Sequence, residues 1–213
     1  MDKQHLLEEL KERVRADTTL PLRETATTLV FGKGDPEAAV VFIGEAPGRN
    51  EDLQGEPFVG AAGKELDTLL SAIGLGLRDV YIANILKYRP PNNRDPNPDE
   101  IAAHTPFLVE QIRIIRPRVI ATLGNFSTKF VLAGFDVAGM KRIGGITHLH
   151  GKPREMKVED LTFIVVPMYH PAATLYNRAL KEELARDFLA LSVQLSAGPH
   201  RPDNDQSLGR WIQ

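Results

Sequence analysis

The stretch from Val40 to Gly63 reads VVFIGEAPGRNEDLQGEPFVGAAG, and it decides the fold. Its first four residues, Val40–Ile43, are strand formers, and the chain then breaks at Gly44 into a loop with glycine, proline and several carboxylates. A buried strand that ends in a polar, glycine-rich loop is where an open α/β sheet binds its ligand. We therefore expect the chemistry of this protein to lie in the segment Gly44-Glu45-Ala46-Pro47-Gly48, with help from later loops.

Three further apolar runs have the composition of buried strands, namely Val80–Asn84, Val119–Leu123 and Leu161–Val166. Amphipathic helical patterns occur at residues 2–15, at about 61–74 and at about 178–195. Two more helices are expected, one that begins at Pro98 and one that follows Gly124-Asn125 and runs through Leu132. Strands that alternate with helices form a parallel sheet that is covered on both faces. The sequence thus predicts a three-layer α/β/α sandwich with a central, mainly parallel four-stranded sheet. We also expect a short strand at Thr27–Phe31 and an irregular, basic hairpin at 140–158.

The size of the chain, 213 residues, suits one domain, which we assign to residues 1–195. Residues 196–213 are polar, and we expect a flexible tail there. With a formal charge of −2, binding to nucleic acid would need a local basic patch. No apolar run approaches the ~20 residues of a membrane span, and the N-terminus lacks a signal-peptide core. We expect a cytoplasmic monomer without a membrane partner.

Unusual polar residues follow the predicted strands. Asn84 ends the second strand, Gly124-Asn125 follows the third, and His170-Pro171 follows the fourth. Because the carboxyl ends of parallel strands meet at one edge of a sheet, these groups are expected to share one crevice with the Gly44–Gly48 loop. Each has a simpler explanation when taken alone, such as a turn, a capping asparagine or a packed histidine. Their convergence on one edge favours a functional site.

Four motifs in the sequence resemble those of the family 4, iron–sulfur type, uracil-DNA glycosylases. They occur in the family's order and spacing: Gly44–Gly48, Gly55-Glu56-Pro57-Phe58-Val59-Gly60 with Ala62-Gly63, Tyr81–Lys87 followed by Arg89-Pro90-Pro91-Asn92, and His170-Pro171-Ala172. The resemblance covers about residues 27–195. It implies a base-excision-repair hydrolase that flips uracil out of single- or double-stranded DNA, hydrolyses its N-glycosidic bond and leaves an abasic site.

The resemblance has one large departure. The family typically holds a [4Fe–4S] cluster on four cysteines, and the corresponding positions here are Asp17, Leu20, Tyr88 and His104. The chain contains no cysteine, so we expect no iron–sulfur cluster, no metal and no other cofactor. Asp17 and His104 alone would leave the shell of another metal half empty. We expect Leu20 and Tyr88 to fill the space by packing.

The resemblance also implies how uracil is bound. Phe58 stacks against the base, and the Asn84 carboxamide reads uracil O4 and N3–H, a pattern that cytosine reverses. The loop residues Gly44, Ala46, Pro47 and Gly48 complete the substrate-binding set.

Two catalytic residues are implied. His170 donates a hydrogen bond to uracil O2, where negative charge develops, and the Ala46 amide is a plausible second donor. Glu45 orients water or stabilises the oxocarbenium-like sugar, with Glu51 and Asp52 left open as alternatives.

Contacts to DNA are expected from two groups of residues. Leu175 stands where the family carries its DNA wedge, with Tyr176 beside it. Cations from two loops are candidates for phosphate contacts: Lys87, Arg89, Arg94, Lys141, Arg142, Lys152, Arg154 and Lys157. For each of these cations, an ordinary solvated surface position is an equally good interpretation.

Two other classes of function stay open. The first is a non-catalytic DNA-binding relative that lost its activity together with the cluster, against which the retained Glu45, Phe58, Asn84 and His170 argue. The second is a nucleotide-binding protein that uses the Gly44–Gly48 loop as a phosphate cradle. The missing Lys-Ser/Thr pair of a P-loop counts against it.

Overall fold

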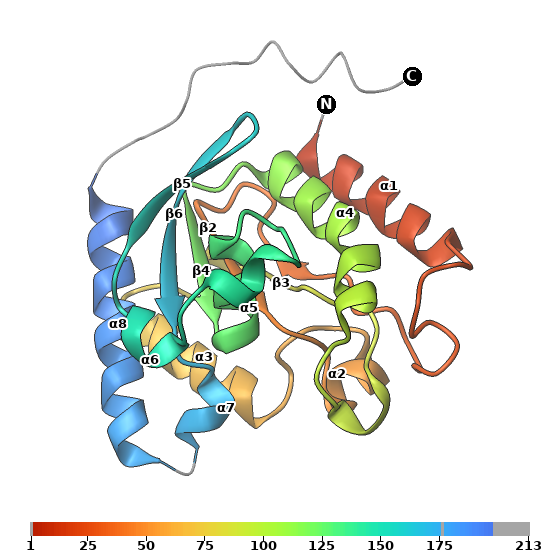
Figure 1. Cartoon of the computed structure of the whole chain (residues 1–213). Helices are drawn as coiled ribbons and strands as arrows, with labels where there is room; N and C mark the ends of the chain where they lie inside the picture. The colour runs from red at the N-terminus through yellow and green to blue at the C-terminus, as the bar shows by residue number, and fades with distance from the viewer. Residues whose placement is uncertain (1, 176, 198–213) are drawn as a thin grey trace.

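The four apolar runs form the centre of one sheet (Figure 1). The computed structural model describes residues 2–175 and 177–197. Within these residues the sheet has six strands in the order β1-β3-β2-β4-β6-β5. Their bounds are β1 Lys33–Gly34, β2 Val40–Gly44, β3 Tyr81–Asn84, β4 Val119–Leu123, β5 Arg154–Val158 and β6 Leu161–Met168. The four central strands are parallel, as predicted, and β1 and β5 add an antiparallel strand at each edge.

Helices cover both faces of this sheet, which confirms the predicted sandwich. Their bounds are α1 Lys3–Ala16, α2 Arg49–Gln54, α3 Ala61–Ala72, α4 Pro98–Ile115, α5 Asn125–Leu132, α6 Ile146–Leu149, α7 Pro171–Thr174 and α8 Arg178–Ser196. Short 3-10 turns lie at η1 Leu77–Asp79, η2 Pro91–Asn93 and η3 Gly139–Arg142. Among the described residues, no helix is both long and apolar enough to cross a membrane.

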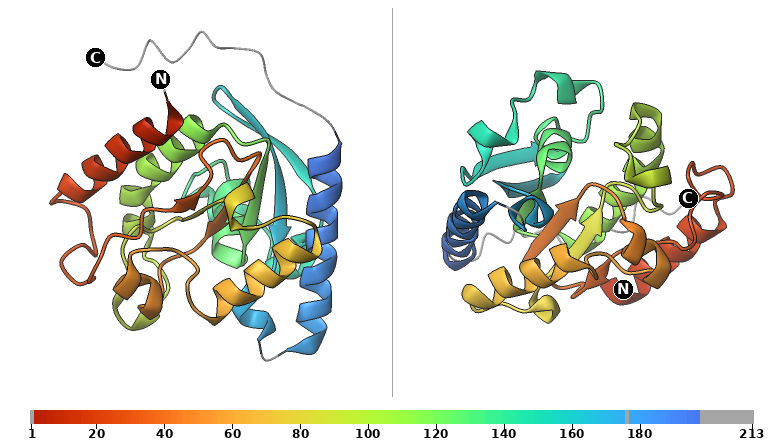
Figure 2. Two further views of the ribbon diagram at one scale, coloured as in Figure 1. Left: turned by 180° about the vertical axis from the view of Figure 1, so that it is seen from behind. Right: turned by 90° about the horizontal axis from the view of Figure 1, so that it is seen from below.

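The side chains of β2 alternate between the two faces of the sheet and so contribute to two separate hydrophobic cores, one under each layer of helices. Val41 and Ile43 pack in a core shared with α4, α5 and the outer helix α1. Val40 and Phe42 point to the opposite core, which α3 and α8 supply, and the Phe42 ring stacks 5.9 Å from that of Phe188. The view from behind in Figure 2 shows α3 and α8 on this second face. A strand buried on both faces therefore reads as a continuous apolar run.

Two local predictions differ from the structure. Residues 27–31 form no strand; the buried Asp52 carboxylate instead accepts hydrogen bonds from the amides of Thr27 (2.8 Å) and Thr28 (3.2 Å). These amides are satisfied by a side chain rather than by a sheet partner. The predicted irregular hairpin at 140–158 is in fact η3, α6 and the edge strand β5, which pairs with β6. The expected tail lies outside the described residues from 198 onward.

Candidate active site

The ends of β2 and β3 are joined through their backbones. Gly44 lies opposite Asn84 in the parallel ladder, the Ile85 amide donates to the Gly44 carbonyl (3.1 Å) and the Leu86 amide donates to the Glu45 carbonyl (3.0 Å). Asn84 is only 3% exposed. The first and third motifs of the sequence therefore form one continuous wall, with the Asn84 side chain at its end.

Gly44 allows the side chains of this wall to come close. A Cβ atom at Gly44 would lie 2.3 Å from Asn84 Oδ1 and 3.0 Å from a ring carbon of Phe58. Any larger residue would displace one of these two groups, which explains why the strand ends in glycine. Phe58 and Asn84, separate in sequence, thus meet over Gly44.

Phe58 has a left-handed backbone, with φ at +53°. Two contacts hold the turn in this shape. The Glu51 carboxylate accepts hydrogen bonds from the amides of Val59 and Gly60, both at 3.1 Å. A Cβ at Gly63 would come within 1.9 Å of the Phe58 carbonyl oxygen, so only glycine fits there. The turn directs the Phe58 ring against His170, with ring centroids 5.6 Å apart and planes at 30°.

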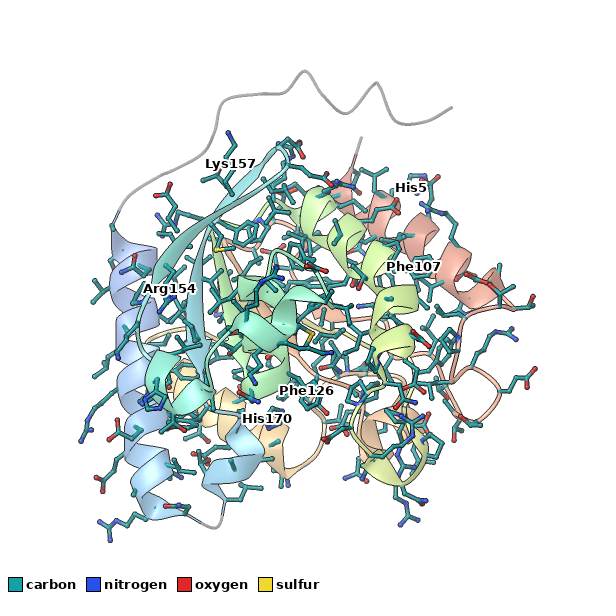
Figure 3. The ribbon with its side chains drawn as sticks, viewed as in Figure 1. His5, Phe107, Phe126, Arg154, Lys157 and His170 are labelled. Carbon is teal, nitrogen blue, oxygen red and sulfur yellow. The ribbon has the colours of Figure 1, made fainter. Side chains whose placement is uncertain are left out.

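His170 follows β6 and caps the short helix α7 (Figure 3). Its Nδ1 accepts a hydrogen bond from the Ala172 amide at 3.1 Å, which assigns the proton of the neutral ring to Nε2. Burial lowers the pKa of His170 to about 4, although the negative charge of Glu51 partly opposes this. A Cβ at Gly124, after β4, would lie 3.2 Å from His170 Cβ. His170 is therefore a neutral donor at pH 7.

The three candidate carboxylates differ in their surroundings. Asp52 and Glu51 accept hydrogen bonds from loop amides, as described above. Glu45 is partly buried, and its carboxylate has no hydrogen-bond partner in the part of the chain that the structure describes. Burial raises the pKa of Glu45 to about 7, and the negative charge of Asp95 adds to this rise. Of the three, Glu45 has a carboxylate available for chemistry.

The four positions of the family's cluster cysteines do not fit an iron–sulfur cluster. Leu20 and Tyr88 are buried in the core, with Tyr88 edge-on to His104 at 6.2 Å. His104 uses both ring nitrogens, because Nδ1 accepts from the Lys87 amide (3.0 Å) and Nε2 contacts the Pro21 carbonyl (3.2 Å). Asp17 accepts hydrogen bonds from Thr19. Residues 2–175 and 177–197 contain no cluster of three or more metal-ligating side chains.

Lys87 does not fit its predicted phosphate contact. Its side chain is 0% exposed, and Nζ donates to the Asn84 carbonyl (2.8 Å) and to Gln111 Oε1 (2.5 Å). Burial lowers the pKa of Lys87 to about 7. Because a phosphate cannot reach this ammonium, the prediction was wrong at this residue. Gln111, on the apolar face of α4, was missed; one polar residue amid Leu108 and Ile112 was the available signal.

The other predicted DNA contacts lie at the surface or close to it. Leu175 is 39% exposed at the end of α7, and Tyr176 lies outside the described residues. Lys141 and Arg142 are exposed on η3, and Arg142 lies 3.7 Å from Asp136. Arg89 is partly buried and donates from Nε to Asn93 Oδ1 at 2.7 Å.

Part of the basic segment lies far from the site. Figure 3 shows Lys157 near the tip of the β5–β6 hairpin, at the opposite end of β6 from His170. Arg154 lies along the same edge strand. Lys157 thus lies away from the carboxyl-terminal edge of the parallel strands, where Asn84 and His170 lie.

Comparison with known proteins identifies relatives over most of the chain. The sequence profile of the Uracil DNA glycosylase superfamily matches residues 31–191. The chain is 45% identical to the type-4 uracil-DNA glycosylase of Sulfurisphaera tokodaii, over 95% of this chain and 90% of that protein. It is 45% identical to the type-4 enzyme of Archaeoglobus fulgidus (85% and 89%) and 42% identical to that of Saccharolobus solfataricus (93% and 90%).

Proposed function

The chain belongs to the uracil DNA glycosylase superfamily, and we propose that it flips uracil out of DNA and hydrolyses the N-glycosidic bond, leaving an abasic site. The observation that carries this proposal is that the Phe58 ring lies beside Asn84 at Gly44 and also packs against His170, so that the turn before α3 meets residues from the ends of β3 and β6. The proposal includes a DNA-repair role and a monomeric, cytoplasmic enzyme, as expected from the sequence.

Base recognition is assigned to Phe58 and Asn84. The ring supplies a plane for stacking, and the carboxamide supplies one donor for uracil O4 and one acceptor for N3–H. Cytosine presents the reverse pattern at these two atoms and would leave the nearly buried Asn84 unpaired. Specificity for uracil over cytosine follows from this cost.

Departure of the base is assigned to His170. The N-glycosidic bond breaks with its electron pair on uracil, and negative charge develops at O2. A neutral imidazole with its proton on Nε2 can donate to that oxygen, and the lowered pKa supports this protonation state at pH 7. The amide of Ala46 is the second donor in this proposal.

Attack of water is assigned to Glu45. A water oxygen bonds to C1′ of the sugar, and its proton passes to the Glu45 carboxylate. Before that step the anion stabilises the positive charge on the sugar. The carboxylate lacks a hydrogen-bond partner among the described residues, whereas Glu51 and Asp52 hold loop amides, and this difference supports the choice of Glu45.

Placement of the DNA is assigned to exposed or partly buried residues after β3, on η3 and after α7. Leu175 fills the gap that the flipped base leaves in the stack, which offsets part of the unstacking cost. Lys141, Arg142 and Arg89 contact phosphates. Tyr176 belongs to the same proposal by its position in the sequence.

The direct test is an excision assay with metal-free protein. Single- and double-stranded oligonucleotides with one uracil are incubated with excess enzyme, and abasic product is detected by alkaline cleavage. We expect product from uracil and none from matched strands with cytosine or thymine. If no product forms while DNA still binds, the chain is a non-catalytic relative and the proposal fails.

A further inference from the structure

A fully buried lysine, Lys87, binds the backbone of Asn84, the residue to which base recognition is assigned. Lys87 is 0% exposed, which is rare for lysine because taking an ammonium out of water costs several kcal/mol unless it is well paired. It is three residues beyond Asn84, and the side chain turns back so that Nζ donates to the Asn84 carbonyl at 2.8 Å. A simple core position would be filled at lower cost by an apolar residue. The buried amine therefore needs a reason.

The amine is the centre of a network that joins separate elements. Nζ also donates to Gln111 Oε1 of α4 (2.5 Å) and lies 3.5 Å from the Phe31 carbonyl oxygen. Gln111 Nε2 donates in turn to the Phe31 carbonyl (3.0 Å) and contacts the Tyr81 hydroxyl of β3 (3.2 Å). Satisfied networks of this kind hold a segment in one conformation.

The backbone of Lys87 is held at both of its polar groups. Its amide donates to His104 Nδ1 (3.0 Å), and its carbonyl accepts from the Val30 amide (2.9 Å). His104 stands at one of the positions where the resembled family has a cluster cysteine. In this chain, His104 holds the segment that follows β3 by accepting a hydrogen bond from the Lys87 amide.

We propose that Lys87 is a positioning residue for uracil excision: by binding the Asn84 carbonyl, it fixes the end of β3 so that the Asn84 carboxamide meets the uracil edge. The inference rests on the proposed function for its chemistry, and on the Lys87–Gln111–Phe31 network for its geometry. Small displacements of a positioned group cost much rate because the aligned geometry is lost.

The test compares two variants that both disturb the core. Lys87→Met keeps most of the side-chain volume but removes the donor. Ile112 adjoins Gln111 on α4, is equally buried and makes none of the hydrogen bonds of the network, so Ile112→Ala controls for lost stability. We expect Lys87→Met to lower the single-turnover excision rate at least about ten-fold and Ile112→Ala to leave it within about two-fold.

A double-mutant cycle separates positioning from general damage. If Lys87 acts through Asn84, Lys87→Met should lower the rate by less than about two-fold in the Asn84→Ala background. An equal loss in both backgrounds would overturn the proposal, as would a wild-type rate for Lys87→Met. If Lys87→Met does not fold, Gln111→Leu removes one anchor of the amine and is subject to the same cycle, with the same outcomes.

A spectroscopic measurement keeps this inference distinct from the proposed function. The side-chain amide resonances of Asn84 are recorded by NMR in wild type, Lys87→Met and Ile112→Ala. A shift in Lys87→Met beyond that in Ile112→Ala supports the positioning role even if no uracil is released. Unchanged Asn84 resonances in Lys87→Met overturn the positioning role even if the wild-type protein releases uracil.

Discussion

Glu45 and His170 both lie at the carboxyl ends of strands, and burial favours the uncharged form of each. The pKa of Glu45 rises to about 7 and that of His170 falls to about 4. Near neutral pH the imidazole is therefore neutral, while the carboxyl is divided between its protonated and ionised forms. The same low-dielectric surroundings therefore prepare one residue to donate a hydrogen bond and the other to accept a proton.

The pH dependence of excision should follow Glu45. We expect the single-turnover rate to rise with pH through about 7, because the carboxylate must be ionised to accept a proton, and to level off above about pH 8. His170 should add no loss down to about pH 5, since it stays neutral there. A rate profile for wild type and Glu45→Gln checks this. A wild-type profile that is flat across neutrality would contradict it.

Glu45→Gln should also raise stability at alkaline pH. A carboxyl whose pKa is higher in the folded state than its unfolded value of 4.5 favours folding when protonated, and this contribution is lost as pH rises through about 7. After discounting for partial exposure, we expect the variant to gain about 1–2 kcal/mol of unfolding free energy at pH 8. Urea unfolding measures this, and the gain should vanish near pH 4. A gain of equal size at both pH values would point to another cause.

Asn84→Ala and His170→Ala should each lower the excision rate while leaving the affinity for DNA nearly unchanged. Removal of one such hydrogen-bond donor typically costs 10²- to 10³-fold in rate, so losses of about that size are expected in single-turnover excision. Affinity for DNA, measured by fluorescence anisotropy, should change little because phosphate contacts are intact. The exposed His148→Ala is the control for histidine loss. Wild-type rates in both site variants would refute the assigned roles.

At the scale of elements, the sequence is informative where burial is uniform. The central strands could be predicted because both of their faces are covered, and the site followed because their carboxyl ends share an edge. The edge strands could not be predicted: β1 has two residues and reads as a turn, and β5 is charged and largely exposed. Lys87 was misread because its partner Gln111 lies on a helix that is distant in sequence.

The helix α7 ends at the exposed Leu175. We expect the contribution of this side chain to the excision rate to differ between duplex and single-stranded DNA. Leu175→Ala should slow excision from duplex DNA by about ten-fold or more and from single strands by less than about two-fold, because only the duplex pays for unstacking. Parallel rates on the same uracil strand, alone and annealed, provide the measurement. Leu189→Ala, 60% exposed on α8, is the matched control. Equal losses on both substrates would argue against a wedge.

At the scale of the whole molecule, the net charge of −2 requires that DNA be held by a local patch. The basic residues are spread over several elements: Arg89 follows β3, Lys141 and Arg142 lie on η3, and Lys157 lies near the tip of the β5–β6 hairpin. The sequence could list the cations but not sort them, because their positions depend on where η3 and the β5–β6 hairpin lie relative to the sheet, which the fold determines.

The salt dependence of DNA binding should distinguish these cations. The affinity is expected to fall linearly with salt on logarithmic axes, and Lys141→Ala and Arg142→Ala should each reduce the slope by about 1 if the side chain contacts a phosphate. Lys157→Ala, at the far end of the hairpin, should leave the slope unchanged. Titrations at several salt concentrations with an abasic-site analogue check this. An equal effect of all three substitutions would place the DNA elsewhere.

The two edges of the sheet have a consequence for behaviour at high concentration. Unpaired strand edges invite other chains to add on, and such addition leads to aggregates. Here one edge is only two residues long and includes Gly34, while the other has Arg154, Glu155 and Lys157 along a largely exposed strand. Neither edge offers an apolar template for strand addition, so both guard the folded protein against fibre-like self-association.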